Sequence, residues 1–182
     1  MTLDRAAARA LGWLVVLALA WPPPGLRVAA PASLAQRLCA PIASLAASLE
    51  WVRFDWHWRS GRNEDAYAAA ERALLLDPVS EAGWKMLALH LAQDRASASA
   101  EPDPLRRRAW IEAGLAVLER GRARCAHPEE LDFLRGSILM QVGWSCLDSS
   151  EAPDWPGGAL AAFRAAREAC RAAARGGRPD AL

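Results

Sequence analysis

Signals that start and stop helices recur along this chain at short intervals, and they constrain its fold more than any other feature. Asp77-Pro78 predicts the end of one helix, and Asp103-Pro104 and His127-Pro128 predict the starts of two others, since proline is tolerated only in a first turn. Ser60-Gly61-Arg62-Asn63 predicts a tight turn with Asn63 as the next N-cap. Together these signals predict helices at about residues 42–59, 63–76, 80–93, 103–120, 128–146 and 156–175.

Strands are not expected anywhere in the chain. No stretch alternates apolar and polar residues convincingly, as a half-buried strand would. Alanine supplies much of the 53% hydrophobic content, and alanine favours helix while it buries little area. The 182 residues therefore predict one all-α domain preceded by a short leader.

The first 25 residues form that leader. Arg5 and Arg9 precede an apolar run at residues 10–21, which prolines end. The run is shorter than the roughly 20 residues of a membrane-spanning helix and suits the apolar part of an export signal. We interpret residues 1–25 as a signal peptide or as an N-terminal membrane anchor that uses residues 6–21, with an ordinary buried helix as the third interpretation. Arginines before the run favour transfer of the remainder across the membrane, to the periplasmic or extracytoplasmic side in a bacterium.

One spacing recurs in the second helix of each predicted helix pair. It occurs as Ala66-x3-Ala70-x2-Ala73, as Ala109-x3-Ala113-x2-Ala116 and as Ala159-x3-Phe163-x2-Ala166. Small residues on one helical face let a neighbouring helix approach closely. The spacing therefore predicts helices that pack as tight pairs.

The first helix of each pair carries a matching pattern, and with it the chain resembles the tetratricopeptide repeat family, whose unit is a helix–turn–helix of about 34 residues. The matching positions are Trp51, Phe54 and Trp58, then Trp84, Leu87, Ala88 and Leu91, then Leu131, Leu134 and Ile138. In the third unit Arg135 occupies the place of a small residue.

The resemblance implies antiparallel helical hairpins stacked as a short α-solenoid over residues 48–175. An N-terminal apolar helix precedes them, followed by an Ala/Pro-rich linker and a weak amphipathic helix at residues 26–47. We expect residues 176–182 to be a disordered tail.

Patterns for catalysis and for metal binding are missing from the sequence. The histidines have no companion at metal-ligand spacing, and Cys125-x-His127 supplies only two ligands. There is no Gly-x-Ser-x-Gly elbow, P-loop or Gly-x-Gly-x-x-Gly sequence. We therefore expect no enzyme activity, no cofactor and no metal. Cys146 and Cys170 are the first candidates for a disulfide, although buried thiols are the commoner state of such cysteines.

Charge gives little indication of a ligand. With 22 basic and 21 acidic residues, the chain has no overall field to attract nucleic acid, which we do not expect as a partner. Arg106-Arg107-Arg108 is the densest basic run, and we interpret it as a solvated helical turn, with contact to an acidic partner or to lipid as the alternative.

The aromatic cluster at residues 51–58 divides between two helical faces. Trp51, Phe54 and Trp58 are spaced i, i+3, i+7, which predicts a face that packs on another helix. Trp56 lies on a different face with Arg59, and the resemblance implies that this is the inward surface on which such repeats hold peptides. By the same resemblance, the predicted partner-binding groove consists of Trp56, Arg59, Lys85, Leu89 and Asp132. The alternative for Trp56 is contact with a preceding helix near Leu45 and Leu49.

These patterns predict a non-catalytic protein–protein interaction or assembly module, exported or membrane-tethered, that binds a segment of another protein on the concave face of its hairpins. The alternative is a structural subunit of a larger membrane protein complex, packed permanently through its hairpins and its apolar N-terminal helix. Self-association is also expected as an option. Three hairpins are near the minimum for a stable solenoid, and a second copy would cover the end hairpins, which lack a neighbour on one side.

Overall fold

The computed structural model describes residues 34–148 and 152–178, with the first helix's side chains described from residue 41 onward. The predicted leader at residues 1–25 lies outside this part of the chain, as do the start of the predicted linker and the end of the predicted tail. The described residues form helices and turns and contain no strand. This confirms the all-α prediction.

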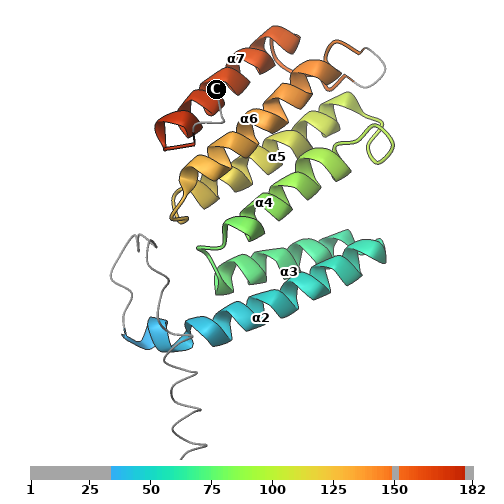
Figure 1. Ribbon diagram of the computed structural model, residues 1–182. Coiled ribbons are helices and arrows are strands. Elements are labelled where there is room, and N and C mark those ends of the chain that lie inside the picture. The colour runs from blue at the N-terminus through green and yellow to red at the C-terminus, as the bar shows by residue number, and fades with distance from the viewer. Residues whose placement is uncertain (1–33, 149–151, 179–182) are drawn as a thin grey trace, which may run out of the picture. The chain divides into compact units, whose positions relative to one another are not determined.

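Within the described ranges, six α-helices pack as antiparallel pairs (Figure 1). The pairs are α2 (Leu34–Arg59) with α3 (Asn63–Leu76), α4 (Glu81–Leu89) with α5 (Pro104–Arg122), and α6 (Pro128–Ser145) with α7 (Gly158–Arg175). The chain divides into two compact units, residues 1–77 and 78–182, and each is described by itself below.

The first unit contains the α2–α3 hairpin. Its turn is made by Gly61, whose φ of 72° suits glycine. Arg62 N–H donates to the His57 carbonyl at 2.9 Å, and Arg62 itself occupies the N-cap position without a side-chain cap. The predicted cap, Asn63, is instead the first residue of α3, because this hydrogen-bonded turn brings the chain into the helix one position early.

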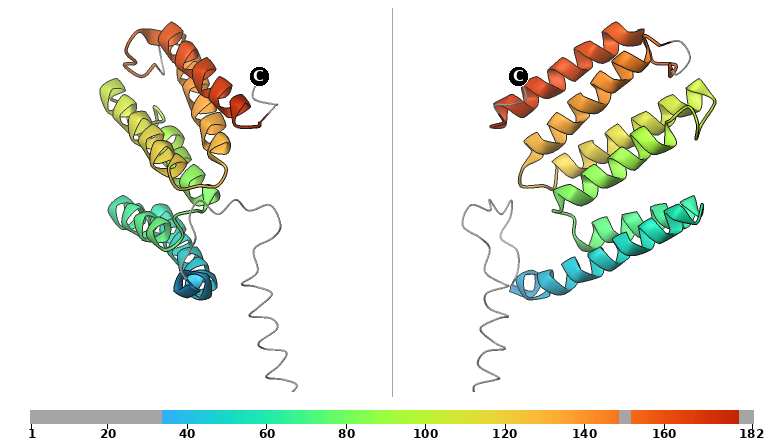
Figure 2. Two further views of the ribbon diagram at one scale, coloured as in Figure 1. Left: turned by 90° about the vertical axis from the view of Figure 1, so that its left-hand side faces the viewer. Right: turned by 45° about the vertical axis from the view of Figure 1, so that its right-hand side comes forward.

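Helix α2 is much longer than its partner. It begins at Leu34, before the predicted start near residue 42, and it contains Pro41. Since α2 has 26 residues and α3 has 14, the N-terminal part of α2 extends past the end of α3 (Figures 1 and 2). From residue 34 onward, the predicted linker and the first predicted helix are therefore joined in one continuous helix.

Small residues, Phe54 and Leu74 form the core of the first unit. Four alanines of α3 are buried, namely Ala66, Ala69, Ala70 and Ala73. Phe54 is 2% exposed, with Trp51 edge-on at 5.5 Å and Trp58 stacked at 5.9 Å between ring centroids. Trp58 also meets Tyr67 of α3 edge-on at 6.1 Å, so the predicted packing on another helix is confirmed for Phe54 and Trp58.

The second unit contains the other two hairpins, with α6 and α7 side by side in both views of Figure 2. Helix α4 continues directly into a π-helical segment, η1 (His90–Arg95), and both pack on α5. Asp103 caps α5 as predicted, since its Oδ1 accepts the Leu105 N–H at 3.0 Å. Helix α6 contacts both α4 and α5, which joins the two hairpins.

The alanine spacing predicted for α5 does not mark its buried face. Ala109 and Ala116 are exposed, whereas Gly114, Leu118 and Gly121 are buried. A Cβ at residue 114 would lie 2.8 Å from the Ala88 carbonyl oxygen, so α4 approaches too closely for alanine. The buried set keeps the predicted spacing of four and then three residues, with glycine in place of the two outer alanines and Leu118 in place of the middle one.

In the third hairpin the close-packed positions also differ from the predicted ones, by three residues on α7 and by one residue on α6. Helix α7 buries Ala162, Ala166 and Ala169, so only Ala166 of its predicted set is buried. On α6 the close approach is made by Gly136, where a Cβ would meet the Cys170 sulfur, and not by Arg135. The prediction that Arg135 occupies the small-residue place is therefore wrong by one position.

Candidate interaction surfaces

Five apolar side chains form a line along the exposed face of α2. They are Ile42, Leu45, Leu49, Val52 and Trp56, which are 57–72% exposed. Their spacing alternates between three and four residues, which is the spacing of the a and d positions in a coiled-coil seam. We call this line the α2 stripe; at 1.5 Å per residue it is about 21 Å long.

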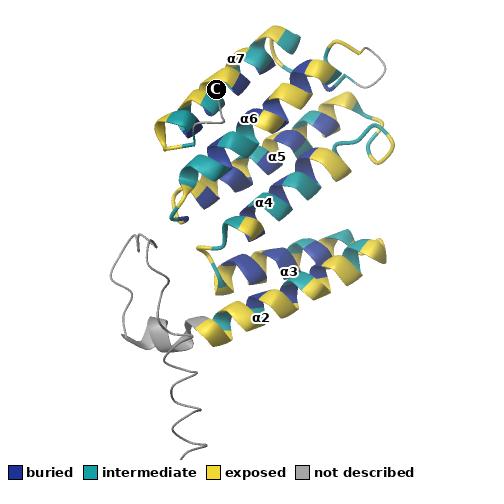
Figure 3. Cartoon of the chain, in the orientation of Figure 1, coloured by how far each residue is buried: buried dark blue, intermediate teal, exposed yellow. Residues whose placement is uncertain are grey.

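Helix α2 has a buried side and an exposed side (Figure 3), and apolar residues lie on both. One face packs on α3 through Ala47 and Phe54. Glu50 lies on that face too. Its carboxylate accepts hydrogen bonds from Arg53 and from Arg72, the latter at 2.8 Å. Burial would raise the pKa of Glu50, but the hydrogen bonds from Arg72 and Arg53 outweigh it and lower the pKa. The negative charge of Glu50 at the inner face is thus neutralised by Arg53 and Arg72. The α2 stripe lies on the other side of the helix and is exposed.

Trp56 occupies the C-terminal end of the α2 stripe. The Arg62 guanidinium carbon lies 4.1 Å from its ring centroid, and His57 meets it edge-on at 5.0 Å. Leu45 and Leu49, expected on a preceding helix as alternative contacts for Trp56, lie on α2 itself and on the same face. That alternative is wrong because α2 is continuous through residues 42–59.

Arg59, the second residue predicted for the groove, follows Trp56 on α2. Its guanidinium forms an exposed ion pair with Asp55 at 3.0 Å. An exposed pair of this kind contributes little stability. Arg59 is therefore accessible at the end of the α2 stripe.

Two other predicted groove residues lie together on α4. Lys85 and Leu89 line one shallow hollow of about 380 Å³, with Met86 between them and Asp94 at one end. Lys85 Nζ is 2.8 Å from Glu130 Oε2, which Arg178 also approaches at 2.6 Å. The hydrogen bond from Lys85, with the nearby Arg178, holds the pKa of Glu130 below its usual value.

Asp132, the last predicted groove residue, does not share that exposed surface. It is 6% exposed on α6, and its Oδ1 lies 3.0 Å from Arg122 Nε of α5. Burial raises the pKa of Asp132, and the Arg122 charge offsets only part of this effect. Asp132 thus belongs to the contact between α5 and α6.

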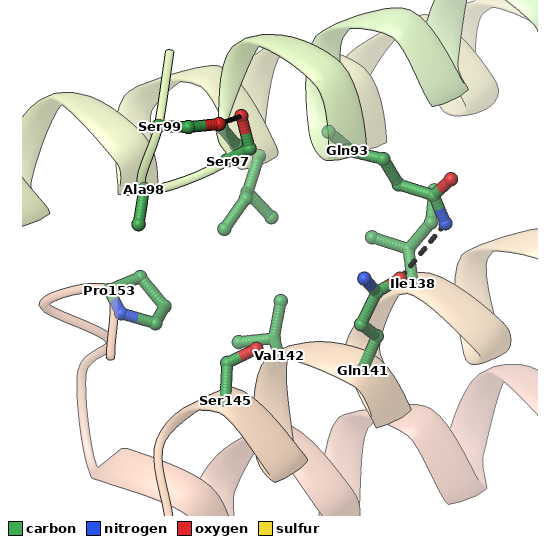
Figure 4. A pocket seen from close by; sticks show the side chains of 12 residues that line it. Gln93, Ser97, Ala98, Ser99, Ile138, Gln141, Val142, Ser145 and Pro153 are labelled. Atoms are coloured by element: carbon green, nitrogen blue, oxygen red, sulfur yellow. Dashed lines mark hydrogen bonds between the residues drawn. The ribbon is translucent and has the colours of Figure 1, made fainter. Parts of the chain in front are cut away.

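Sequence reasoning missed a cavity of about 210 Å³ in the second unit (Figure 4). Ile138 and Val142 supply apolar walls, and Gln93 Nε2 donates to Gln141 Oε1 at 2.9 Å beside them. None of the described residues that line the cavity is charged, and its volume is smaller than the about 300–1,000 Å³ of a small-molecule site. It can accommodate one apolar side chain or a few water molecules.

The basic run beside this cavity is not a uniformly solvated turn. Arg107 is 5% exposed and donates to three backbone carbonyls, those of Glu101 at 3.3 Å, Pro102 at 3.2 Å and Ala152 at 2.8 Å. Arg106 remains exposed, as predicted. Arg107 therefore joins the two segments that separate the helices of each hairpin in the second unit.

Cysteines and other ligand-type side chains form no cluster in the described part of the chain. Cys146 and Cys170 are free thiols, so the suggested Cys146–Cys170 disulfide is not formed. Across the described ranges, no three His, Cys, Asp or Glu side chains gather as metal ligands would. None of the described helices combines the length and hydropathy of a membrane-spanning segment.

The chain matches no family model, no curated protein and no solved structure. Its surfaces are therefore interpreted from their own geometry.

Proposed function

We propose that this protein is a non-catalytic protein–protein interaction or assembly module that binds a helical partner through the α2 stripe. The observation that carries the proposal is the exposure of five apolar side chains in one line, each more than half accessible. Exposed apolar surface of this extent marks interaction sites in soluble proteins. Narrow apolar lines at i, i+3 and i+7 spacing are typical of helix recognition.

The three hairpins are proposed to be tetratricopeptide-like repeats. The buried spacing of Gly114, Leu118 and Gly121 on α5 supports this proposal, because it places small residues where the first helix of the pair approaches. The hollow at Lys85 and Leu89 is proposed as a secondary contact, where a bound segment would find an apolar floor beside a lysine.

The module is proposed to act outside the cytoplasm, exported or tethered by residues 6–21. The mass of the chain isolated from its native cells tests this. A mature start near Ser33 or Gln36 supports cleavage, and an intact Met1 in the membrane fraction supports the anchor. Recovery only as a soluble, full-length cytoplasmic chain contradicts both.

Two tryptophans of α2 provide a matched test of the interaction. We expect Trp56→Ala to reduce the assembled fraction of the full chain at least tenfold in native mass spectrometry, with the melting temperature nearly unchanged. Trp51→Ala is expected to lower the melting temperature instead, because Trp51 packs against buried Phe54. An unchanged assembled fraction in Trp56→Ala contradicts the proposal, and so does unfolding by that substitution.

A further inference from the structure

We infer that the partner of the α2 stripe is the α2 stripe of a second copy of this chain, packed antiparallel. This inference rests on the proposed function, because it names the helix that the module binds.

The width of the α2 stripe indicates a helical partner. It contains two apolar positions per seven residues, which is the width of a seam between two helices. A helix that lies on a membrane surface has a broader apolar face with basic residues along its edges. The positions that flank the α2 stripe are Ala46, Ser48, Arg53 and Asp55, which hold one positive and one negative charge. Helix pairing therefore fits the α2 stripe better than lipid does.

The sequence of the α2 stripe is complementary to itself in the antiparallel direction. We place a two-fold axis perpendicular to α2, crossing the α2 stripe at the height of residue 47. Ile42 is then level with Val52 of the second copy, and Leu45 is level with Leu49 of the second copy. The isologous contact then contains four layers of aliphatic side chains. Arg53 and Asp55 lie level with the uncharged stretch at residues 39–41 of the other copy.

Arg59, three residues after the end of the α2 stripe, disfavours parallel pairing. Arg59 occupies the next seam position after Trp56, and in a parallel pair two Arg59 guanidinium groups would face each other across the seam. Parallel packing also aligns the two helix dipoles, whereas antiparallel packing opposes them.

The available area is sufficient for a specific contact. The four aliphatic side chains of each copy, with Trp56 at each end of the contact, bring together on the order of 1,000 Å² of surface, the size at which a specific interface begins. The α2 stripe also begins on the part of α2 that extends past α3. In the antiparallel pair, this overhang packs along the C-terminal half of the other α2.

Single cysteines on α2 of the full chain test both the partner and its direction. Ser48 is an exposed flanking position near the proposed axis, so Ser48→Cys brings two thiols together across it. Asp55→Cys is the matched control, because antiparallel packing separates its two thiols by more than about 20 Å at 1.5 Å per residue. Both variants carry Cys39→Ala, which removes the other thiol of α2, and both are oxidised in intact cells and compared on non-reducing gels.

We expect a crosslinked dimer with Ser48→Cys and at least tenfold less with Asp55→Cys. Adding Leu49→Glu should reduce the Ser48→Cys dimer at least tenfold, since it places charge in the central layers. Leu75→Glu, on a leucine of α3 that is 79% exposed against 57% for Leu49, should leave the dimer unchanged. Equal crosslinking at residues 48 and 55 would overturn the antiparallel arrangement.

Absence of any crosslinked dimer would overturn the second copy as partner. The proposed function would then stand only if Trp56→Ala still disperses an assembly with a different protein. If Trp56→Ala changes no assembly either, the proposed function is wrong as well.

Discussion

Gly121 of α5 lies directly against the indole of Trp84, and a Cβ at residue 121 would come within 2.7 Å of Trp84 Cγ. The indole cannot move aside easily. It is 2% exposed, and its Nε1–H donates to the Pro78 carbonyl at 2.9 Å. Leu131 of α6 would also lie 2.8 Å from the added Cβ. One missing side chain therefore lets three helices of the second unit meet.

We expect Gly121→Ala to destabilise the second unit by about 1–3 kcal/mol through overpacking. Helix propensity alone would favour alanine over glycine by about 1 kcal/mol, so the contact with Trp84 decides the sign. Urea unfolding followed by tryptophan fluorescence measures the change. Ala116→Ser on the exposed face of α5 is the control, expected within about 0.5 kcal/mol of the wild type. A more stable Gly121→Ala protein would contradict the packing described here.

Glu130 gives the folded state an acid-sensitive contact. Its pKa is lowered by the hydrogen bond from Lys85 and by Arg178, so its ionised form favours folding. That contribution is present above the unfolded pKa and is lost as the pH falls through the lowered folded pKa. We expect Glu130→Gln to destabilise the protein by about 1 kcal/mol at pH 7 and by less at about pH 3.5. Glu168→Gln changes an exposed carboxylate of α7 and is the control. The difference in its free energy of unfolding from the wild type should be the same at both pH values.

Asp132, two residues along the same helix, should behave in the opposite way. Burial raises its pKa in spite of Arg122, so the ionised form opposes folding. The protonated form of Asp132 is the one that favours folding. Its contribution to stability is complete below the unfolded pKa and is lost as the pH rises through the raised folded pKa. We expect Asp132→Asn to be more stable than the wild type at pH 7, with the gain shrinking at about pH 4. Destabilisation at pH 7 would mean that the Arg122 ion pair outweighs the cost of burial.

The α2 stripe shows why sequence patterns predicted the helices better than the surfaces. Helix boundaries depend on local residues such as Asp77-Pro78, and α3 has the predicted bounds. All five residues of the α2 stripe lie within the helix predicted at residues 42–59, but the predicted boundary between the linker and the repeat domain, after residue 47, divided them between two segments. The structure crosses that boundary with one helix, and the five side chains therefore form one line.

Positions that depend on another helix could not be predicted in the same way. Gly114 and Gly121 keep the spacing of the two outer alanines, and a search that allowed glycine would have found them. Asp132 has no comparable local signal, because its burial depends on the way α6 turns toward Arg122 of α5. The choice between adjacent residues such as Arg135 and Gly136 depends on helix rotation, which spacing alone does not determine.

Arg107 provides a final prediction, because it is the buried member of three consecutive arginines. Its guanidinium donates to the carbonyls of Glu101, Pro102 and Ala152, and thereby fixes two connecting segments at once. We expect Arg107→Met to cost about 3 kcal/mol of stability, since it leaves those carbonyls without donors. Limited proteolysis should then cut residues 97–103 and 152–157 faster than in the wild type.

Arg106→Met is the matched control for this prediction. Arg106 is exposed and forms one ion pair with Asp103 at 3.6 Å, so its loss should change stability by less than about 0.5 kcal/mol. Arg107→Lys should fall between the two, because one ammonium cannot reach all three carbonyls in the geometry that a planar guanidinium satisfies. Equal effects of Arg106→Met and Arg107→Met would show that the run acts through its charge and not through the hydrogen bonds of its central residue.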